Sequence, residues 1–242
     1  MNKIAFVTGG SRGIGAAIVR RLAKDGATVA FTYQSSGAAA DALVSEINAA
    51  GGKALALKVD AADALATRAA IDKVASQFGR LDILVNNAGV LHLGDVSELT
   101  LEAFDQTIAV NVRAVFAATQ AAVAHMKEGG RVINIGSTNA ERMPFAGGSI
   151  YAMSKSALTG LVQGLARDLG PRGITVNNVQ PGPVDTDMNP EDSDFAKSLH
   201  DLMAIKRHGR SEEIAGMVAY LASEEAGYVT GAGLNIDGGF AA

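Results

Sequence analysis

The sequence predicts a single α/β domain over residues 1–242, with a doubly wound parallel sheet of about seven strands and helices on both faces. Short runs rich in Val, Ile and Leu alternate along the chain with longer segments of helical period. This alternation is typical of consecutive strand–helix–strand units whose strands are covered on both sides. The chain has 48% hydrophobic and 19% charged residues, and no repeat or linker divides it. One compact domain is therefore expected.

Each strand candidate is a short apolar run, and each helix candidate lies between two of them. The expected strands are 4–8, 28–33, 54–59, 83–85, 131–136, 175–179 and 234–236. The first helix is expected to start near Gly13, and the others to cover 38–50, 63–78, 101–127, 150–169 and 211–222. Ser211, followed by two acids, is the expected cap of the last helix. The stretch 185–210 fits no regular element and is expected to be a lid or substrate loop.

The composition excludes several classes of function. The formal net charge of −4 provides no positive field for nucleic acid or anionic lipid. The absence of Cys rules out disulfides, thiolate metal sites and a cysteine nucleophile. The N-terminal residues run directly into the first strand, and no apolar stretch is expected to approach the ~18 residues of a membrane span. A cytoplasmic protein with no membrane partner is expected.

A glycine-rich loop, Thr8–Gly15, follows the first strand and opens the first helix. Glycines in this setting let the backbone approach a pyrophosphate, whose charge is met by free N–H groups and the positive helix end. The alternative is a plain glycine turn. The expected cofactor contacts in this loop are Gly9, Ser11, Arg12, Gly13, Ile14 and Gly15.

The end of the second strand indicates which dinucleotide binds. Domains that select NAD place an Asp or Glu there, on the ribose 2′-hydroxyl. Here the strand ends Thr32-Tyr33-Gln34-Ser35-Ser36, with no acid. Arg12 is suited to pair with a 2′-phosphate, and serine hydroxyls can donate to it. NADP(H) is therefore predicted over NAD(H), with Tyr33 and Ser35 at the phosphate.

Tyr151 and Lys155 stand four residues apart, on one face of a predicted helix. A nearby cation favours the ionised form of a phenol, so we expect Tyr151 to be the proton donor and Lys155 to lower its pKa. Ser137 ends the fifth predicted strand, where it can donate to a substrate carbonyl oxygen. An exposed helix face and a turn-capping serine are the alternatives.

Taken together, these motifs resemble the classical short-chain dehydrogenase/reductase family over almost the whole chain. The resemblance looks closest to the 3-oxoacyl-carrier-protein reductase branch, and it implies a Rossmann-type fold. The matching elements are the Thr8–Gly15 loop, Asp60, the 86–89 stretch Asn-Asn-Ala-Gly, Asn111, Ser137, Tyr151 with Lys155, and the Pro181-Gly182 pair.

The resemblance also implies roles for residues that follow other strands. Asn111 would hold a water that links Lys155 to solvent, and Lys155 would bind the hydroxyls of the nicotinamide ribose. The implied cofactor contacts are Asp60 at the adenine; Asn87, Ala88 and Gly89 along the adenosine ribose and central sheet; and Pro181, Gly182, Val184 and Thr186 near the carboxamide. The two asparagines equally suit a turn whose side chains cap backbone groups.

Two departures from the family pattern bear on function. Ser137 lies 14 residues before Tyr151, one more than in the commonest members, so Thr138 is a rival for the hydroxyl role. The segment 127–130, Lys-Glu-Gly-Gly, lacks the basic cluster that carrier-protein reductases tend to carry there. This weakens an acyl carrier protein as the natural partner.

We therefore expect an enzyme that reduces a ketone to a secondary alcohol with NADP(H), its substrate being left open. The alternatives are a 3-oxoacyl-carrier-protein reductase and a non-catalytic nucleotide- or ligand-binding regulator. The four histidines show no metal-ligand spacing and no positioned acid, so no metal is expected. The segment 101–127 has more apolar side chains than one buried helix face requires, which either deep burial or a subunit interface explains. In similar family members this helix packs in a subunit interface, so the resemblance implies a homotetramer, with a dimer as the alternative.

Overall fold

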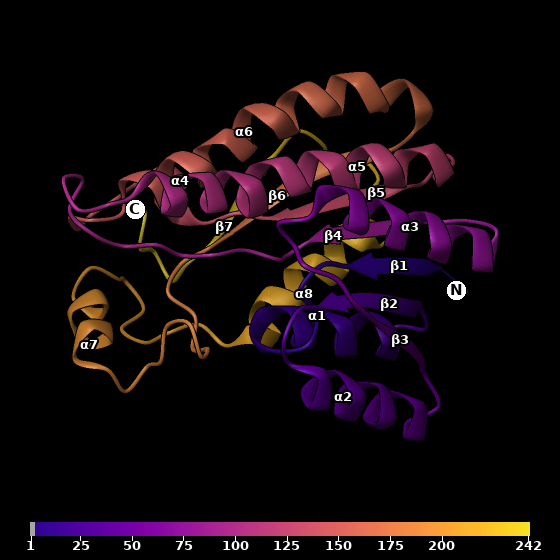
Figure 1. Cartoon of the computed structure of the whole chain (residues 1–242), viewed down its shortest axis with the longest axis horizontal. Helices are drawn as coiled ribbons and strands as arrows, with labels where there is room; N and C mark the ends of the chain where they lie inside the picture. The colour runs from indigo at the N-terminus through magenta and orange to yellow at the C-terminus, as the bar shows by residue number, and fades with distance from the viewer. Residues whose placement is uncertain (1–2) are drawn as a thin grey trace.

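The computed structural model describes residues 3–242. Seven parallel strands form one sheet in the order β3-β2-β1-β4-β5-β6-β7, which confirms the doubly wound α/β fold (Figure 1). The strands are β1 (Ile4–Val7), β2 (Thr28–Tyr33), β3 (Lys53–Lys58), β4 (Ile83–Asn86), β5 (Arg131–Ile135), β6 (Thr175–Pro181) and β7 (Gly233–Ile236). Each begins and ends within two residues of its predicted position. In the register, Ala5 of β1 lies between Val29 of β2 and Ile83 of β4.

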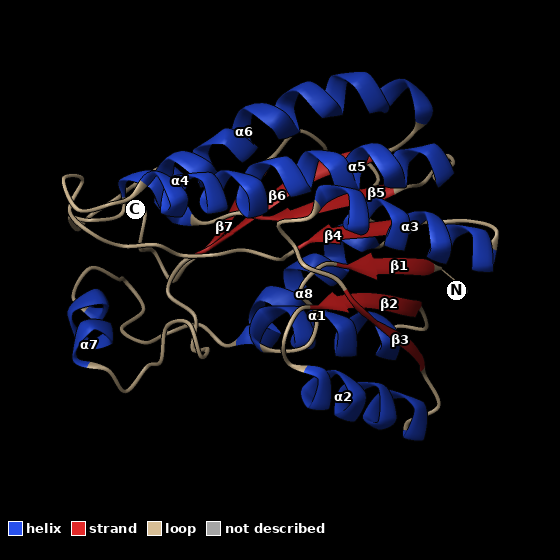
Figure 2. Ribbon diagram, in the orientation of Figure 1, coloured by secondary structure: helices blue, strands red, loops and turns tan. Residues whose placement is uncertain are grey.

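Helices cover both faces of the sheet (Figure 2). They are α1 (Gly13–Lys24), α2 (Gly37–Ala49), α3 (Ala64–Phe78), α4 (Leu101–Ile108), α5 (Ala114–His125), α6 (Ser149–Leu169), α7 (Asp194–His200) and α8 (Ser211–Ala222). One apolar core joins the sheet to α1, α2 and α8, and a second joins it to α3, α5 and α6. The central strands are buried on both faces, which explains their continuous apolar runs.

The segment expected as one helix, 101–127, has an interruption. Five residues of π-helix, Ala109–Arg113, separate α4 from α5, and the helical stretch ends at His125. Leu101–His125 is long and apolar enough to pass the length and composition test for a membrane span, contrary to the expectation that no stretch comes near it. In this fold α5 packs between the sheet and its neighbours as a core helix. Most of its apolar residues are buried, with Phe116 as an exposed exception.

Two details of the expected elements are wrong. The stretch 185–210, expected to contain no regular element, contains a short helix, α7, which Ser193 caps through a 3.0 Å hydrogen bond from Ala196 N to its Oγ. Ser211 is the first residue of α8 and does not cap it; Glu213 instead accepts from Arg210 N at 2.7 Å. The acid three residues into the helix reaches back to the preceding backbone N–H, so serine is not needed there.

Because all strands are parallel, their carboxyl ends meet at one edge of the sheet. The glycine loop follows β1, the 86–89 stretch begins at the end of β4, and Ser137 comes two residues after β5. The stretch 185–210 leaves the same edge after β6, and in Figure 1 it carries α7 away from the sheet. The predicted site residues are therefore gathered where open α/β sheets bind ligands.

Candidate active site

The glycine loop has a backbone that only glycine suits at key positions. Gly9 has a φ of +66°, and a Cβ there would stand 3.0 Å from the Cα of Ala88. A Cβ on Gly15 would collide with the carbonyl oxygen of Gly9. The loop therefore lies tightly on the turn after β4 and leads directly into the N-terminus of α1. Such a cradle can receive the pyrophosphate of a dinucleotide.

Side chains from neighbouring strands hold this loop in place. Asn87 donates through Nδ2 to the carbonyl oxygens of Thr8 (3.0 Å) and Gly9 (2.9 Å). Thr8 in turn accepts at Oγ1 from the backbone N–H groups of Asn87 and Ala88, both at 3.0 Å. Thr32 accepts from Gly9 N at 3.0 Å. The capping interpretation of Asn87 is therefore confirmed, whereas the positioning hydroxyls of Thr8 and Thr32 were missed from sequence because threonine is common in strands.

The corner next to the end of β2 presents no carboxylate of that strand. Arg12 precedes α1 with an exposed guanidinium, which lies 3.5 Å from the carboxylate of Asp187 in the stretch 185–210. Ser35 is exposed and Tyr33 half-buried at the strand end. Asp60, exposed after β3, accepts from Ala62 N at 2.9 Å. Arg12, Tyr33 and Ser35 fit a 2′-phosphate, since the guanidinium of Arg12 is paired only with a solvent-exposed carboxylate, which a phosphate can replace.

Tyr151 and Lys155 lie on the same face of α6, next to Ser137. The Lys155 Nζ is 5.7 Å from the centre of the Tyr151 ring and donates to the carbonyl oxygen of Ile135 at 2.9 Å. Lys155 is only 5% exposed and Ser137 only 7%. Thr138, the rival hydroxyl, donates instead to Pro181 O at 3.2 Å. The structure thus brings the phenol, ammonium and serine hydroxyl together.

Burial governs the protonation of this cluster. Burial raises the pKa of Tyr151 above its ordinary value, and a hydrogen bond with Ser137 only partly opposes this effect. Burial also lowers the pKa of Lys155 to about 8. The expected lowering of the tyrosine pKa by Lys155 is therefore not what this structure has, because removal of water disfavours both charged forms. A protonated phenol is the form that can donate a proton.

Asn111 lies in the π-helical segment and is 1% exposed. Its Nδ2 donates to Val90 O and to Ser154 Oγ, each at 3.0 Å, and its Oδ1 accepts from Val90 N at 2.9 Å. A Cβ on Gly89 would come within 3.5 Å of this Oδ1 and 3.6 Å of the Lys155 Nζ. Asn111, Gly89 and Lys155 therefore converge, and Asn111 ties the stretch after β4 to α6. Single-turn π-bulges often occur at functional sites.

The residues after β6 close the site from the other side. A Cβ on Gly182 would come within 2.7 Å of Asp237, so the chain passes close to the end of β7 here. Val184 is buried in a bridge with Gly209. Thr186 approaches the glycine loop, since a Cβ on Gly13 would lie 3.3 Å from its methyl group. An open cleft of about 720 Å³ lies between the glycine loop and this segment. It is lined by Gly13, Asp185, Thr186, Asp187, Pro190, Glu191 and Asp192.

Two histidines do have positioned acids, which corrects the expectation from sequence. His125 Nε2 is 2.8 Å from Asp72 Oδ1, and His200 Nε2 is 3.9 Å from Glu191 Oε1. His208 joins the second pair, with its Nδ1 2.8 Å from His200 Nε2. The partners are 8 to 53 positions apart along the chain, so sequence spacing did not reveal them. Burial and the adjacent His200 lower the pKa of His208.

Comparison with known proteins agrees with this geometry. The sequence model of a family described as enoyl-(acyl carrier protein) reductase matches residues 9–241. A 3-oxoacyl-[acyl-carrier-protein] reductase from Staphylococcus aureus is 40% identical over 243 residues, covering 99% of this chain and 98% of the relative. The chain belongs to the short-chain dehydrogenase/reductase family. This confirms the resemblance on which the implied cofactor contacts depend.

Several members of the family are more similar still. A short-chain dehydrogenase/reductase structure from Serratia marcescens is 64% identical, with a TM-score of 0.98 and coverage of 99% and 98% of the two chains. A Burkholderia cenocepacia structure in complex with NADP is 55% identical, with the same TM-score and coverage. A cyclic-di-GMP-binding biofilm dispersal mediator protein of Escherichia coli is 52% identical over 240 residues, 99% of this chain and 98% of that protein.

Proposed function

We propose that this protein is an NADP(H)-dependent oxidoreductase that reduces a ketone to a secondary alcohol. The observation that carries the proposal is the buried cluster of Tyr151, Lys155 and Ser137, next to a glycine cradle that fits a dinucleotide. NADP(H) is proposed because Arg12 is exposed at the start of α1, while β2 ends without a carboxylate. The NADP complex of a 55% identical relative supports the same cofactor.

The mechanism follows from what each side chain can do. NADPH, when bound, supplies a hydride to the carbonyl carbon. Tyr151, whose pKa burial raises, stays protonated and donates its proton to the substrate oxygen. Ser137 donates a hydrogen bond to the same oxygen as negative charge develops on it. Lys155, whose pKa burial lowers to about 8, is protonated at neutral pH and can return a proton to the tyrosine. Asn111 donates to Ser154 of the same helix and so holds this part of the site in place.

Enzyme assays test this proposal. Purified protein is given NADPH or NADH with a panel of ketones, diketones, sugars and acetoacetyl thioesters, and cofactor consumption is followed by absorbance. We expect turnover with NADPH on part of the panel. In Tyr151→Phe we expect a rate loss of about 10²- to 10⁴-fold with little change in NADPH affinity. Unimpaired turnover in that variant overturns the assignment of the proton donor.

A ligand-binding regulator is the second candidate, favoured by the 52% identity to the cyclic-di-GMP-binding protein. The intact set of Asn111, Ser137, Tyr151 and Lys155 argues for catalysis, since a binder has no need of all four. Calorimetry with cyclic-di-GMP, in the presence and absence of NADPH, separates the two. Binding of cyclic-di-GMP without turnover on any carbonyl compound favours the regulator.

A carrier-protein reductase is the third candidate, supported by the 40% identical relative. The surface before β5 argues against it. Residues 127–130 carry one lysine and one glutamate, so they form no basic patch for an acidic carrier protein. The guanidinium of Arg172 is used within the fold, where it donates to the carbonyl oxygens of Val123 (2.6 Å) and Met126 (3.1 Å). The acetoacetyl thioester of carrier protein should therefore be reduced no better than the acetoacetyl thioester of coenzyme A.

We also propose a homotetramer, built on the helices that carry the active site. Phe104 on α4, Phe116 on α5 and Met153 on α6 are each more than a third exposed, although they are large and apolar. Apolar side chains on adjacent helices of one face are typical of a subunit interface. Light scattering at micromolar concentration should give four times the chain mass, and a monomer would contradict the proposal.

A further inference from the structure

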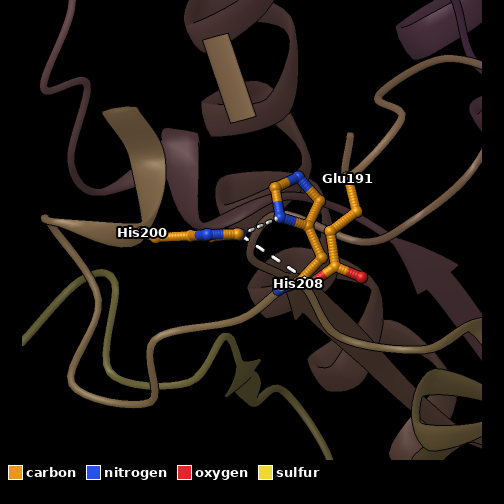
Figure 3. Close-up of side chains that lie close together, drawn as sticks. All are labelled: Glu191, His200 and His208. Atoms are coloured by element: carbon orange, nitrogen blue, oxygen red, sulfur yellow. Dashed lines mark hydrogen bonds and ion pairs between the residues drawn. The ribbon is translucent and has the colours of Figure 1, made fainter. Parts of the chain in front are cut away.

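Glu191, His200 and His208 form a compact cluster in the substrate loop (Figure 3). They come from three separate places: the turn after Pro190, the end of α7, and the residue before Gly209, which bridges to Val184. One potential ligand atom from each side chain lies within 4.8 Å of the other two. The cluster shares no residue with the Tyr151 cluster and has no part in the mechanism above.

We propose that these three side chains bind a divalent transition-metal ion of the Zn²⁺ class. Two imidazoles and one carboxylate are ligands that Zn²⁺ favours, and three protein ligands leave one position for water. Bonds of about 2.0–2.2 Å place tetrahedral ligand atoms roughly 3.3 Å apart. The separations here are 2.8 Å between the two imidazole nitrogens and 3.9 Å between His200 and Glu191. Each must change by about half an ångström, which small side-chain rotations supply.

The site contains a fixed ligand and two adjustable ones. His208 is 1% exposed, and its backbone N–H donates to Glu191 Oε1 at 3.2 Å, which brings the carboxylate alongside. His200 and Glu191 are more exposed and can rotate toward an ion. Figure 3 shows His200 directing Nε2 toward both other residues, so this atom already faces the point where an ion would bind.

The hydrogen bonds around His208 determine which of its ring nitrogens carries the proton, and therefore whether a proton is released when an ion binds. Asn189 places its amide nitrogen 3.0 Å from His208 Nε2, and an amide nitrogen can only donate. His208 therefore carries its proton on Nδ1 and donates it to His200 Nε2. For His208 to bind an ion through Nδ1, this proton moves to Nε2, and the Asn189 amide turns so that its oxygen accepts it. No proton is lost, and Asn189 becomes the outer partner that orients the ligand.

Metal binding would join the two ends of the stretch 191–208 and thereby restrain the loop that borders the cofactor cleft. Glu191 lines that cleft, and Asp187, which faces Arg12, lies four residues before it. An ion held by Glu191 and His208 would limit how far this part of the loop moves. The proposal does not rest on the oxidoreductase activity, and its test does not use turnover.

The test is titration of the purified, tag-free and chelator-treated full chain with Zn²⁺ by calorimetry, and with Co²⁺ by visible absorption. We expect one equivalent to bind with micromolar or tighter affinity, and the Co²⁺ spectrum to have tetrahedral character. His200→Gln and Glu191→Gln should each weaken Zn²⁺ binding by at least tenfold. The matched control is His125→Gln, which removes the other histidine that faces an acid, Asp72, and should bind as the parent does.

Hydrogen exchange provides a second readout. One equivalent of Zn²⁺ should slow exchange in peptides covering 186–208, whereas Mg²⁺, which prefers oxygen ligands, should not. Absence of stoichiometric Zn²⁺ binding overturns the proposal. So does Zn²⁺ binding in Glu191→Gln that is as tight as in the parent, or binding that is lost in His125→Gln. Glu191 is exposed, so if His200→Gln fails to fold, Glu191→Gln still decides.

Discussion

Replacing Lys155 by Met should stabilise the protein while it removes activity. The Lys155 ammonium is 5% exposed, and burial lowers its pKa from 10.5 to about 8. The unfolded chain therefore binds a proton more tightly than the folded chain does. At pH 7 this difference destabilises the fold by about 3 kcal/mol, from 1.36 kcal/mol for each pKa unit. The neutral Met carries no such penalty.

The substitution Lys155→Met also removes one hydrogen bond. Lys155 donates to the buried carbonyl oxygen of Ile135 at 2.9 Å, and leaving that acceptor unpaired costs about 1 kcal/mol. Lys155→Met should therefore be more stable than the parent by about 2 kcal/mol at pH 7, which corresponds to an increase of ~4–8 °C in Tm for a chain of this size. Residues that a catalytic site needs for activity often lower the stability of the folded protein in this way.

The stability difference between Lys155→Met and the parent should depend on pH. Between pH 8 and 10.5 the unfolded parent holds a proton that the folded parent has lost, so parent stability rises with pH in this window. The advantage of Lys155→Met should therefore shrink by about 1 kcal/mol between pH 7 and pH 9. Urea unfolding of both proteins without cofactor, at pH 7, 8 and 9, measures it. A less stable variant, or a pH-independent difference, would refute the reasoning.

Three further sets of substitutions test other parts of the structure. Arg12→Gln should weaken NADPH binding by about 10- to 100-fold and leave NADH binding unchanged, whereas Asp187→Asn should slightly strengthen NADPH binding, both by fluorescence titration. Gly15→Ala should lower Tm and abolish NADPH binding, because the added Cβ would collide with a backbone carbonyl oxygen. The control is Gly216→Ala in α8, where the nearest atom to an added Cβ is an arginine side-chain nitrogen at 3.8 Å, and this variant should fold normally. Glu213→Gln should cost about 1 kcal/mol by urea unfolding at pH 7. That loss should fade as pH falls from 4.5 through about 2, the lowered pKa of Glu213.

The fold was predictable because its signals are local. The alternation of apolar runs and helical segments correctly predicted the seven strands. The Thr8–Gly15 loop correctly predicted which edge of the sheet carries the site. Tyr151 and Lys155 were found because a helix converts a spacing of four residues into proximity. The cap of α8 was misassigned because Ser211 is a good cap by type, while Glu213 satisfies the backbone from inside the helix.

The features that could not be predicted from the sequence depend on contacts between distant segments of the chain. The interruption at Ala109–Arg113 accompanies the hydrogen bonds that Asn111 makes to Val90 and Ser154, and no local pattern records them. His200 and His208 meet only because α7 turns the loop back on itself. The direction of the Tyr151 pKa shift also depended on burial, which cannot be read from the lysine four residues away.

The central claim is that a hydride passes from the nicotinamide to a carbonyl carbon while Tyr151 protonates the oxygen. It is tested most directly by incubating the protein with NADPH deuterated at the transferable position of the nicotinamide, together with a ketone that is turned over. Mass spectrometry of the alcohol should find one deuterium on the carbinol carbon, and almost no alcohol should form with Tyr151→Phe. An alcohol without deuterium, or bound cofactor with no product from any carbonyl compound, would contradict the account.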